Sequence, residues 1–287
     1  MSPKPKVLLF DIGGVCVVSP MSAIASYEHT HSLPAGYINH AISASGPNGA
    51  WARLERGEIS LDASFFAAFG SDLQNEAVWK AQWTQHLRSR SQNASHEKDA
   101  AGGTAAEEAL FNAPPVPRID AEKLYWAMMA MSRRPDPHIY PALQALRAHC
   151  DETKEFIVAA CSNTSIFPAD HPFSDPDTHE GRFNKELKAH FELFVSSAHV
   201  GMRKPNRDIF EYTIRELDVL ARRKWGADVG VKAEEVVFLD DIGSNLKAAR
   251  ACGLRTVKVV MGRTQDAVAQ LEEITGLDLR GTTKARL

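Results

Sequence analysis

Two kinds of hydrophobic pattern alternate along the chain. A short run of strand-forming residues at 6–10 stops at an acid and two glycines, which predicts a buried strand followed by a loop. The next clear run of this kind comes only at 156–160. The roughly 140 residues between them carry apolar positions at three- and four-residue spacing, so we expect mostly helices there.

Four segments of this region show the helical spacing: 50–55, 61–69, 79–87 and 124–131. Trp79, Trp83 and Leu87 recur every four residues, and we interpret this apolar stripe as packing inside a helical bundle. Residues 91–118 differ in kind, with seven Ala, two Gly, three Pro and a single aromatic residue. Such a composition buries little apolar surface, so we expect a mobile insertion at 91–118.

The C-terminal half alternates strands with helices. After the run at 156–160, strands are predicted at 192–195, 235–239 and 256–260, and helices at 207–220, 245–251 and 265–274. A polar stretch with three prolines, 168–182, is predicted to be a loop. Regular β–α alternation predicts an α/β fold with a parallel sheet covered by helices on both faces. Such sheets bind ligands at the carboxyl ends of their strands, so the residues directly after each strand matter most.

Composition narrows the function classes. The chain has 287 residues, 44% of them hydrophobic, and a formal net charge of −3, which is ordinary for a globular protein of about two domains. Mild acidity argues against nucleic-acid binding, and the longest basic run, Arg222-Arg223-Lys224, is interpreted as a solvated helix face. No apolar run approaches the ~18 residues of a membrane span. The four cysteines show no Cys-x-x-Cys spacing, so we expect them to be reduced thiols in the core.

The two ends of the chain bear on its location. Residues 1–10 hold only a short apolar run, less than the ~7 residues of a secretory signal, so we expect an intracellular, cytoplasmic protein. The last three residues, Ala285-Arg286-Leu287, loosely resemble a peroxisomal address and offer that compartment as an alternative. The sequence carries no indication of the oligomeric state.

Polar residues that can carry chemistry follow four of the predicted strands. They are Asp11, then Ser162 and Asn163, then Lys204, then Asp240 and Asp241 with Asn245 a few residues farther on. Each is also common in turns and helix caps. Because the carboxyl ends of parallel strands share one edge, the pattern gathers two acidic sites, a hydroxyl–amide pair and a cation there. Helix caps alone do not require this combination.

These residue types suit phosphoryl transfer. Two neighbouring acidic sites repel each other, and Mg²⁺, which prefers carboxylate, carbonyl and water oxygens, relieves the repulsion. A carboxylate can also attack phosphorus and form an aspartyl-phosphate. Lys204 would neutralise the transferring group, while Ser162 and Asn163 would donate hydrogen bonds to its oxygens. We therefore expect a magnesium-dependent site for a small phosphorylated substrate.

Four motifs, in this order, resemble the haloacid dehalogenase superfamily. They are Phe10-Asp11-Ile12-Gly13-Gly14-Val15, Ser162-Asn163, Gly201-Met202-Arg203-Lys204-Pro205 and Phe238-Leu239-Asp240-Asp241-Ile242-Gly243-Ser244-Asn245. Within it, the chain is most similar to the phosphatase domains at the N-terminus of soluble epoxide hydrolases, which 46–49, 53–60 and 271–276 also resemble. Only 91–118 and the loop near 168–182 fall outside the resemblance. The epoxide-hydrolysing half is expected to be absent, since about eleven residues follow Gly276.

The resemblance implies both a fold and a set of roles. It implies a Rossmann-like core, 1–16 and 136–287, with a helical cap, 17–135, that would exclude water and select the substrate. The implied site residues are Asp11 as nucleophile, Mg²⁺ held by Asp11, Asp241 and the backbone carbonyl of Gly13, phosphate bound by Ser162, Asn163 and Lys204, and support from Asp240 and Asn245.

Gly13 departs from the family pattern. Phosphatases of the family usually carry an Asp two residues after the nucleophile, as the general acid for the leaving group. A backbone carbonyl at Gly13 can still bind metal, but general acid catalysis, typically worth roughly 10²–10⁴-fold, needs a side chain. Three explanations stay open: esters with good leaving groups, a proton from water or from His29 or His31, or phosphoryl-ligand binding without turnover.

Carbon–halogen hydrolysis is a further activity of the superfamily. That chemistry also passes through an Asp ester, but it needs no metal. Its members lack an acidic pair after the fourth strand of the core. Asp240-Asp241 therefore disfavours it.

Overall fold

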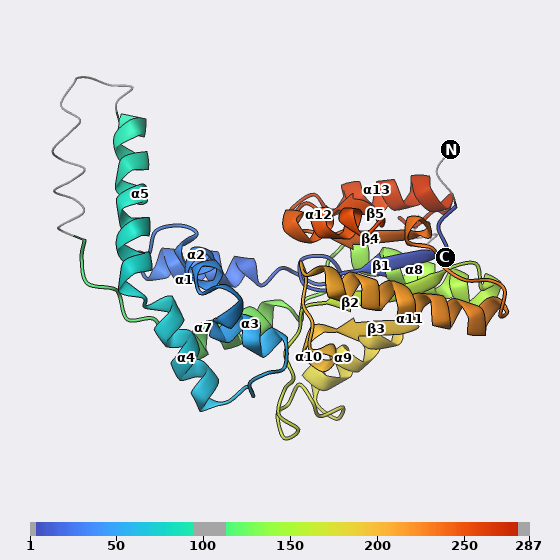
Figure 1. Ribbon diagram of the computed structural model, residues 1–287, viewed down its shortest axis with the longest axis horizontal. Helices are drawn as coiled ribbons and strands as arrows, with labels where there is room; N and C mark the ends of the chain where they lie inside the picture. Colours follow the sequence, from blue (N-terminus) through green and yellow to red (C-terminus); the bar gives the residue numbers. More distant parts are fainter. Residues whose placement is uncertain (1–3, 95–112, 281–287) are drawn as a thin grey trace, which may run out of the picture. The chain divides into compact units, whose positions relative to one another are not determined.

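The structure is a computed structural model that describes residues 4–94 and 113–280 (Figure 1). The chain forms two compact units. The sheet unit comprises Met1–Pro20, Leu54–Leu61 and Met129–Leu287, and the helical unit comprises Met21–Arg53 and Asp62–Met128. The short segment Leu54–Leu61 thus belongs to the sheet unit, although the chain on either side of it belongs to the helical unit.

The sheet unit is built on a five-stranded parallel sheet with the order β3-β2-β1-β4-β5. Its strands are β1 (Val7–Phe10), β2 (Ile157–Ser162), β3 (Leu193–Ser196), β4 (Val236–Asp240) and β5 (Arg255–Lys258). The central strand β1 pairs on both sides, with Leu8 opposite Val158 of β2 and Val237 of β4. The chain adds β2 and β3 on one side of β1 and then β4 and β5 on the other. The direction of strand addition therefore reverses between β1 and β4, the place where α/β sheets bind ligands.

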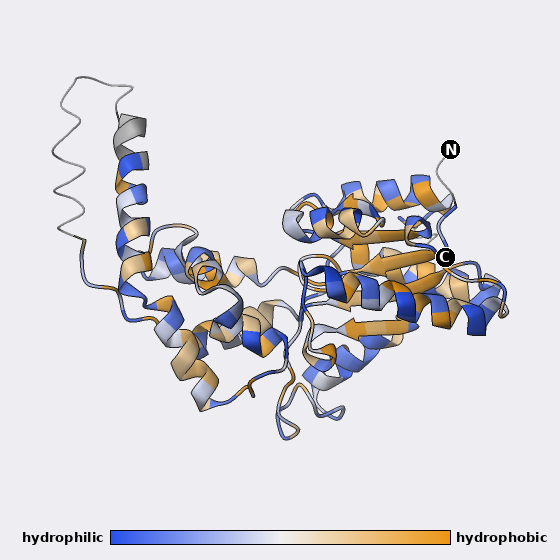
Figure 2. Cartoon of the chain, viewed as in Figure 1, coloured by the Kyte–Doolittle hydropathy of each residue, from blue (hydrophilic) through white to orange (hydrophobic). Residues whose placement is uncertain are grey.

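Helices cover both faces of the sheet, and each face has its own apolar core. One face carries α8 (Ile139–Thr153), α9 (His179–Ala189) and α13 (Thr264–Thr275), and the other carries α11 (Arg207–Trp225) and α12 (Gly243–Ala251). Successive strand residues point to opposite faces, so Leu8 joins the first core and Leu9 the second. Strands buried on both faces are apolar along most of their length, as Figure 2 shows, and this explains the strong signal at 6–10.

The helical unit has an aromatic core. Its helices are α1 (Met21–Thr30), α2 (Tyr37–Ala44), α3 (Ala50–Glu55), α4 (Ala63–Leu73), α5 (Glu76–Ala94) and α7 (Ala121–Met131), of which α3 and α7 end in the sheet unit. Tyr37 meets Trp79 edge-on with 5.0 Å between ring centroids, and Trp83 packs on Trp79 at 5.5 Å. Trp79 is fully buried, so the interpretation of the Trp79 stripe as bundle packing is confirmed.

The predicted elements are present, with differences at their ends. Each strand starts one residue away from its predicted start, and its end differs from the prediction by at most two residues. The helix predicted at 207–220 extends to Trp225, since Ala221 still packs in the core below α11. Two segments expected to lack regular structure are partly helical. α9 begins inside 168–182 because the Thr178 hydroxyl caps it, accepting a hydrogen bond from Gly181 N at 3.0 Å, and α5 runs four residues into 91–118.

Some expectations lie outside the described residues. These are residues 95–112 of the insertion expected at 91–118 and the tripeptide Ala285-Arg286-Leu287, which stay predictions. Within 4–94 and 113–280, no helix is both long and apolar enough to cross a membrane. All four cysteines are free, and Cys16, Cys150 and Cys161 are buried in the sheet unit, as expected of core thiols.

Gly57 shows how tightly Leu54–Leu61 is held in the sheet unit. Its φ is +66°, and a Cβ there would lie 2.2 Å from the carbonyl oxygen of Ala198, a backbone atom that cannot rotate away. We expect Gly57→Ala to lower the free energy of unfolding by about 3 kcal/mol or more, because strain and a steric clash add. Gly276→Ala, at φ +76° in open space, should cost only about 1 kcal/mol. Urea denaturation measures both, and equal losses would contradict the packing.

Candidate active site

Three acids converge at the carboxyl edge of the sheet. Asp11 directly follows β1, Asp240 is the last residue of β4, and Asp241 comes next. Phe10 lies opposite Leu239 in the parallel pairing of β1 with β4, so these strand ends are neighbours. One carboxylate oxygen from each acid lies within 4.8 Å of the others. The reversal of strand order between β1 and β4 therefore creates the acidic cluster that the sequence predicts.

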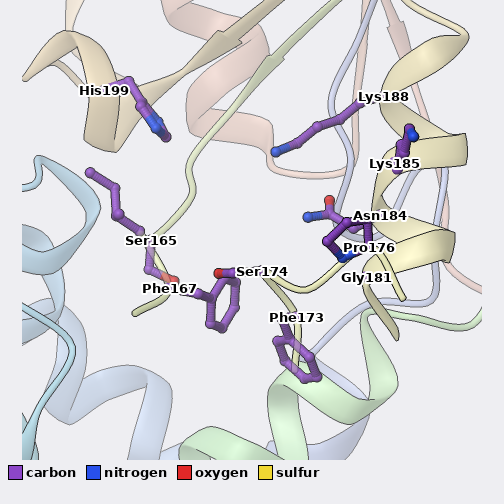
Figure 3. A pocket seen from close by; sticks show the side chains of 11 residues that line it. Ser165, Phe167, Phe173, Ser174, Pro176, Gly181, Asn184, Lys185, Lys188 and His199 are labelled. Atoms are coloured by element: carbon purple, nitrogen blue, oxygen red, sulfur yellow. The ribbon is translucent and has the colours of Figure 1, made fainter. Parts of the chain in front are cut away.

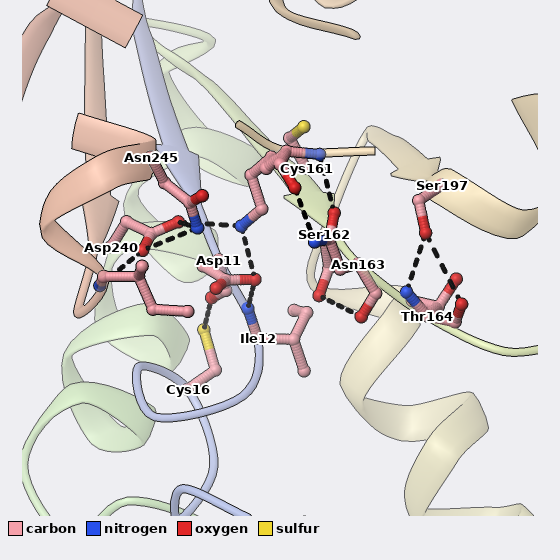
Figure 4. Close-up of polar contacts among 12 residues, drawn as sticks. Asp11, Ile12, Cys16, Cys161, Ser162, Asn163, Thr164, Ser197, Asp240 and Asn245 are labelled. Atoms are coloured by element: carbon pink, nitrogen blue, oxygen red, sulfur yellow. Dashed lines mark hydrogen bonds and ion pairs between the residues drawn. The ribbon is translucent and has the colours of Figure 1, made fainter. Parts of the chain in front are cut away.

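Lys204 supplies the cation between Asp11 and Asp240, the two acids labelled in Figure 4. Its Nζ lies 2.9 Å from Oδ1 of Asp11 and 2.8 Å from Oδ2 of Asp240, and only 1% of its side chain is exposed. Burial by itself lowers the pKa of Lys204, but the two carboxylates outweigh burial and raise the pKa above its ordinary value. The amine is therefore charged at neutral pH. Removing it would leave two buried carboxylates without a counter-charge, which is strongly unfavourable.

Asp240 is fully buried and both of its oxygens are engaged. The backbone N–H of Ile242 donates to Oδ1 at 2.7 Å, and Asn245 Nδ2 donates to Oδ1 at 3.2 Å and to Oδ2 at 3.0 Å. Lys204 takes the remaining position on Oδ2. This saturated carboxylate suits the supporting role expected of Asp240 and Asn245, because it fixes the turn that carries Asp241.

Asp11 and Asp241 keep carboxylate oxygens for a metal. The contacts of Asp11 with Lys204 and with the N–H of Ile12, at 2.7 Å, both use Oδ1. Oδ1 of Asp241 is buried and has no hydrogen-bond partner among the described residues. Burial, reinforced by Asp11 and Asp240, raises the pKa of Asp241 to about 7. Burial likewise raises the pKa of Asp11 to about 6 against the pull of Lys204. The carboxylate oxygens of Asp11 and Asp241 are hard donors, the ligand type that Mg²⁺ prefers.

The loop after β1 passes directly against Asp241. Gly14 has φ +78°, and a Cβ at this position would lie 2.3 Å from Oδ2 of Asp241. Any side chain there would displace the carboxylate. Gly14 was not predicted to be a site residue, although consecutive glycines after a strand usually mark positive φ or close backbone approach.

Asn163 has a contact that the sequence did not predict. Its side-chain amide pairs with the backbone of Lys204, with Nδ2 donating to the Lys204 carbonyl at 3.0 Å and the Lys204 N–H donating to Oδ1 at 2.8 Å. Asn163 therefore holds the loop that delivers the lysine. The hydroxyl of Ser162 is buried beside it, with only a long contact of 3.4 Å to the Asn163 carbonyl. Phosphate binding by Ser162 and Asn163 stays a prediction.

An ion pair beside the lysine was also missed. Arg203 precedes Lys204, and its Nε and Nη2 lie 2.7 and 2.6 Å from Oε2 of Glu55, which is buried. Glu55 belongs to the same Leu54–Leu61 segment as Gly57, so this segment is bound to the Lys204 loop by charge as well as by packing. No local pattern links Glu55 to Arg203, because the two residues are 148 positions apart.

Gly13 has room for a side chain. A Cβ there would meet only Pro20 Cδ, at 3.6 Å, which is an ordinary van der Waals distance. Of the two histidines considered as alternative acids, His31 stacks on Tyr27 with 3.9 Å between ring centroids, and its Nδ1 lies 2.9 Å from the Tyr27 carbonyl oxygen. That is a packing role within the helical unit.

Comparison with known proteins identifies the family of this chain. A family profile of haloacid dehalogenase-like hydrolases matches residues 5–253, the stretch that contains all of these side chains. The chain belongs to this family. Bifunctional epoxide hydrolase 2 of Sus scrofa is 27% identical over 283 residues, which are 96% of this chain, so the resemblance to soluble epoxide hydrolases is confirmed. Acyl-CoA dehydrogenase family member 10 of Mus musculus is 24% identical over 276 residues, also 96% of this chain.

The haloacid dehalogenase-like chain spans only part of these relatives. It corresponds to 40% of the length of the Sus scrofa protein and 19% of the Mus musculus protein. Among solved structures, a dehalogenase with an intermediate complex shares the fold, with a TM-score of 0.51 and 14% identity over 97% of this chain and all of that one. The prediction of a Rossmann-like α/β core with inserted helices is thus confirmed.

The raised pKa values predict a pH-dependent response to Mg²⁺. Since the pKa values of Asp11 and Asp241 lie above the ordinary 3.8, the folded metal-free protein keeps protons that the unfolded chain has lost. Their contribution to stability therefore falls as the pH rises from about 4 to 7. Mg²⁺ requires the ionised acids, so saturating Mg²⁺ should raise the midpoint of thermal unfolding by roughly 5 °C at pH 8 and hardly at all at pH 5.

Two variants separate the metal site from general charge effects in that experiment. Asp241→Asn should abolish the response to Mg²⁺ at pH 8, while Asp228→Asn, which removes an exposed acid before β4, should leave it intact. A response of equal size at pH 5 and pH 8 would show that these acids do not bind the metal.

Proposed function

We propose that this chain is a Mg²⁺-dependent phosphatase that hydrolyses a small phosphorylated molecule through an aspartyl-phosphate on Asp11. The observation that carries the proposal is the sharing of one buried lysine by Asp11 and Asp240, beside an Asp241 oxygen that has no partner in the described part of the chain. Three acids and one amine leave an excess of negative charge. A divalent cation offsets this excess and lets the site attract an anionic phosphoryl group.

Asp11 carries the covalent step in this proposal. Its carboxylate oxygen attacks phosphorus, the bond between phosphorus and the ester oxygen breaks, and the phosphoryl group stays on Asp11. Lys204 and the N–H of Ile12 orient the carboxylate and favour its ionised form. Mg²⁺, held by Asp11, Asp241 and the carbonyl of Gly13, would supply charge neutralisation at the phosphoryl oxygens. Water then attacks phosphorus, and inorganic phosphate leaves as the Asp11 carboxylate is restored.

Gly13 favours a second candidate function. The leaving ester oxygen needs a proton, and position 13 has no side chain that could deliver one. A chain with the nucleophile and the metal acids but no general acid is also suited to bind a phosphoryl ligand without turning it over. The two candidates therefore differ in the rate of phosphate release. A phosphatase releases phosphate from esters with good leaving groups, whereas a binding protein releases none.

The proposed activity is tested with p-nitrophenyl phosphate and Mg²⁺. We expect release of inorganic phosphate that stops with a chelator and falls at least ~10³-fold in Asp11→Asn, because the nucleophile is lost. Asp228→Asn is the matched control and should keep the wild-type rate. Identical rates for wild type and Asp11→Asn would refute the phosphatase. Activity on a haloacid that persists in chelator would support carbon–halogen hydrolysis instead.

Restoring an acid at position 13 separates the two candidates further. Gly13 has room for a Cβ, so Gly13→Asp should fold and place a carboxyl group beside the reacting ester. We expect kcat for alkyl phosphates to rise about 10²-fold, whereas p-nitrophenyl phosphate, with its good leaving group, should change by less than about 3-fold. Gly13→Asn controls for side-chain volume. A wild type without turnover that gains activity in Gly13→Asp would support ligand binding as the function.

A further inference from the structure

A groove of about 530 Å³ lies within the sheet unit (Figure 3). Its walls come from the loop after β2, from α9 and from α10 (Ser197–Val200). The size falls in the range of small-molecule sites, roughly 300–1,000 Å³. Nothing in the chemistry around Asp11 uses these side chains.

The groove is basic. Lys185 and Lys188 line it from α9 together with Asn184, and none of its lining residues is acidic. Neither lysine forms an ion pair with a carboxylate in the part of the chain that the structure describes, and Lys188 Nζ lies 5.5 Å from the centroid of the Phe194 ring. In Figure 3 the ends of Lys188 and Asn184 point into the groove. Two cations beside an amide donor suit an anionic ligand group.

An aromatic wall gives the groove an apolar side. Phe167 and Phe173 line it and meet edge-on, with 4.8 Å between ring centroids. The Arg133 guanidinium covers the Phe173 ring at 3.7 Å and is itself held by Glu180 at 3.1 Å. Phe173 is therefore fixed in place and presents a preformed apolar surface beside the lysines.

The groove begins close to Asn163, one of the residues expected to bind phosphate. Ser165 lines it and lies two residues after Asn163, so their Cα atoms are at most about 7.6 Å apart. A series of side-chain contacts also links this loop to His199. Thr164 Oγ1 lies 2.6 Å from Ser196 Oγ, which lies 2.7 Å from Nδ1 of His199. His199 lines the groove. The end of the groove at Ser165 therefore lies only a short stretch of loop away from Asn163.

We propose that this basic groove binds a second anionic group of the substrate, a carboxylate or a phosphate, carried on a short apolar linker. The substrate class is thus a phosphate ester with two anionic ends and an apolar body between them. This inference rests on the proposed function, because it takes the phosphoryl end to lie at Asp11. The lysines select the distal anion, and the aromatic wall contacts the linker.

Non-hydrolysable probes test the groove without turnover. Alkylphosphonates roughly three to eight carbons long are compared with ω-carboxyalkylphosphonates of equal length, by titration calorimetry with saturating Mg²⁺. At one length, the carboxylated probe should bind about 10-fold more tightly than its partner, the gain typical of a charge-assisted hydrogen bond. Lys185→Gln/Lys188→Gln should reduce that preference below about 2-fold.

A matched double variant controls for net charge in this experiment. Arg215→Gln/Arg223→Gln removes two exposed cations from α11, and neither of them lines the groove. This variant should keep the full preference. Three results would overturn the proposed role of the groove. They are equal binding of both probe series at every length, absence of phosphonate binding, and a preference that survives loss of both lysines. Phosphate release from alkyl phosphates reports separately on the proposed function, so the two ideas can fail independently.

Discussion

One buried amine balances the charge at the carboxyl edge of the sheet. Lys204 Nζ contacts Asp11 and Asp240 at 2.9 and 2.8 Å, in a place where unpaired carboxylates would be very costly. Its single charge is shared by two acids, so the third, Asp241, keeps a raised pKa and an oxygen without a partner among the described residues. Lys204 therefore stabilises the buried acids, and the cluster still keeps an excess of negative charge that suits a divalent cation.

The surrounding structure keeps that amine in place. Asn163 pairs with the Lys204 backbone on both sides of its amide, and Arg203 is bound to Glu55. Glu55 and Gly57 attach Leu54–Leu61 to the same region, so a segment flanked by the helical unit contributes to the sheet unit. The lysine loop is thus fixed by contacts from two distant parts of the sequence, which limits how far Nζ can move from Asp11.

The loop after β2 connects the two proposed binding regions. Asn163 faces the lysine loop, while Ser165 and Phe167 face the basic groove. Thr164 lies between them and is tied to the end of β3 through Ser196. In the proposed reaction, the identity of the organic group matters twice, because Gly13 offers no proton donor. It sets how readily the ester oxygen departs, and in our proposal it is also what the groove recognises.

The sequence by itself determined the α/β class, the five strands and the residues that follow them. Continuous apolar runs and the acid, amide and lysine after them are local signals that survive folding because each is set by its own strand and turn. The reversal of strand order, the Arg203–Glu55 pair and the packing of Gly14 against Asp241 were decided only by the tertiary structure. They depend on which distant segments pack together, and no periodicity within one segment encodes a contact made between two.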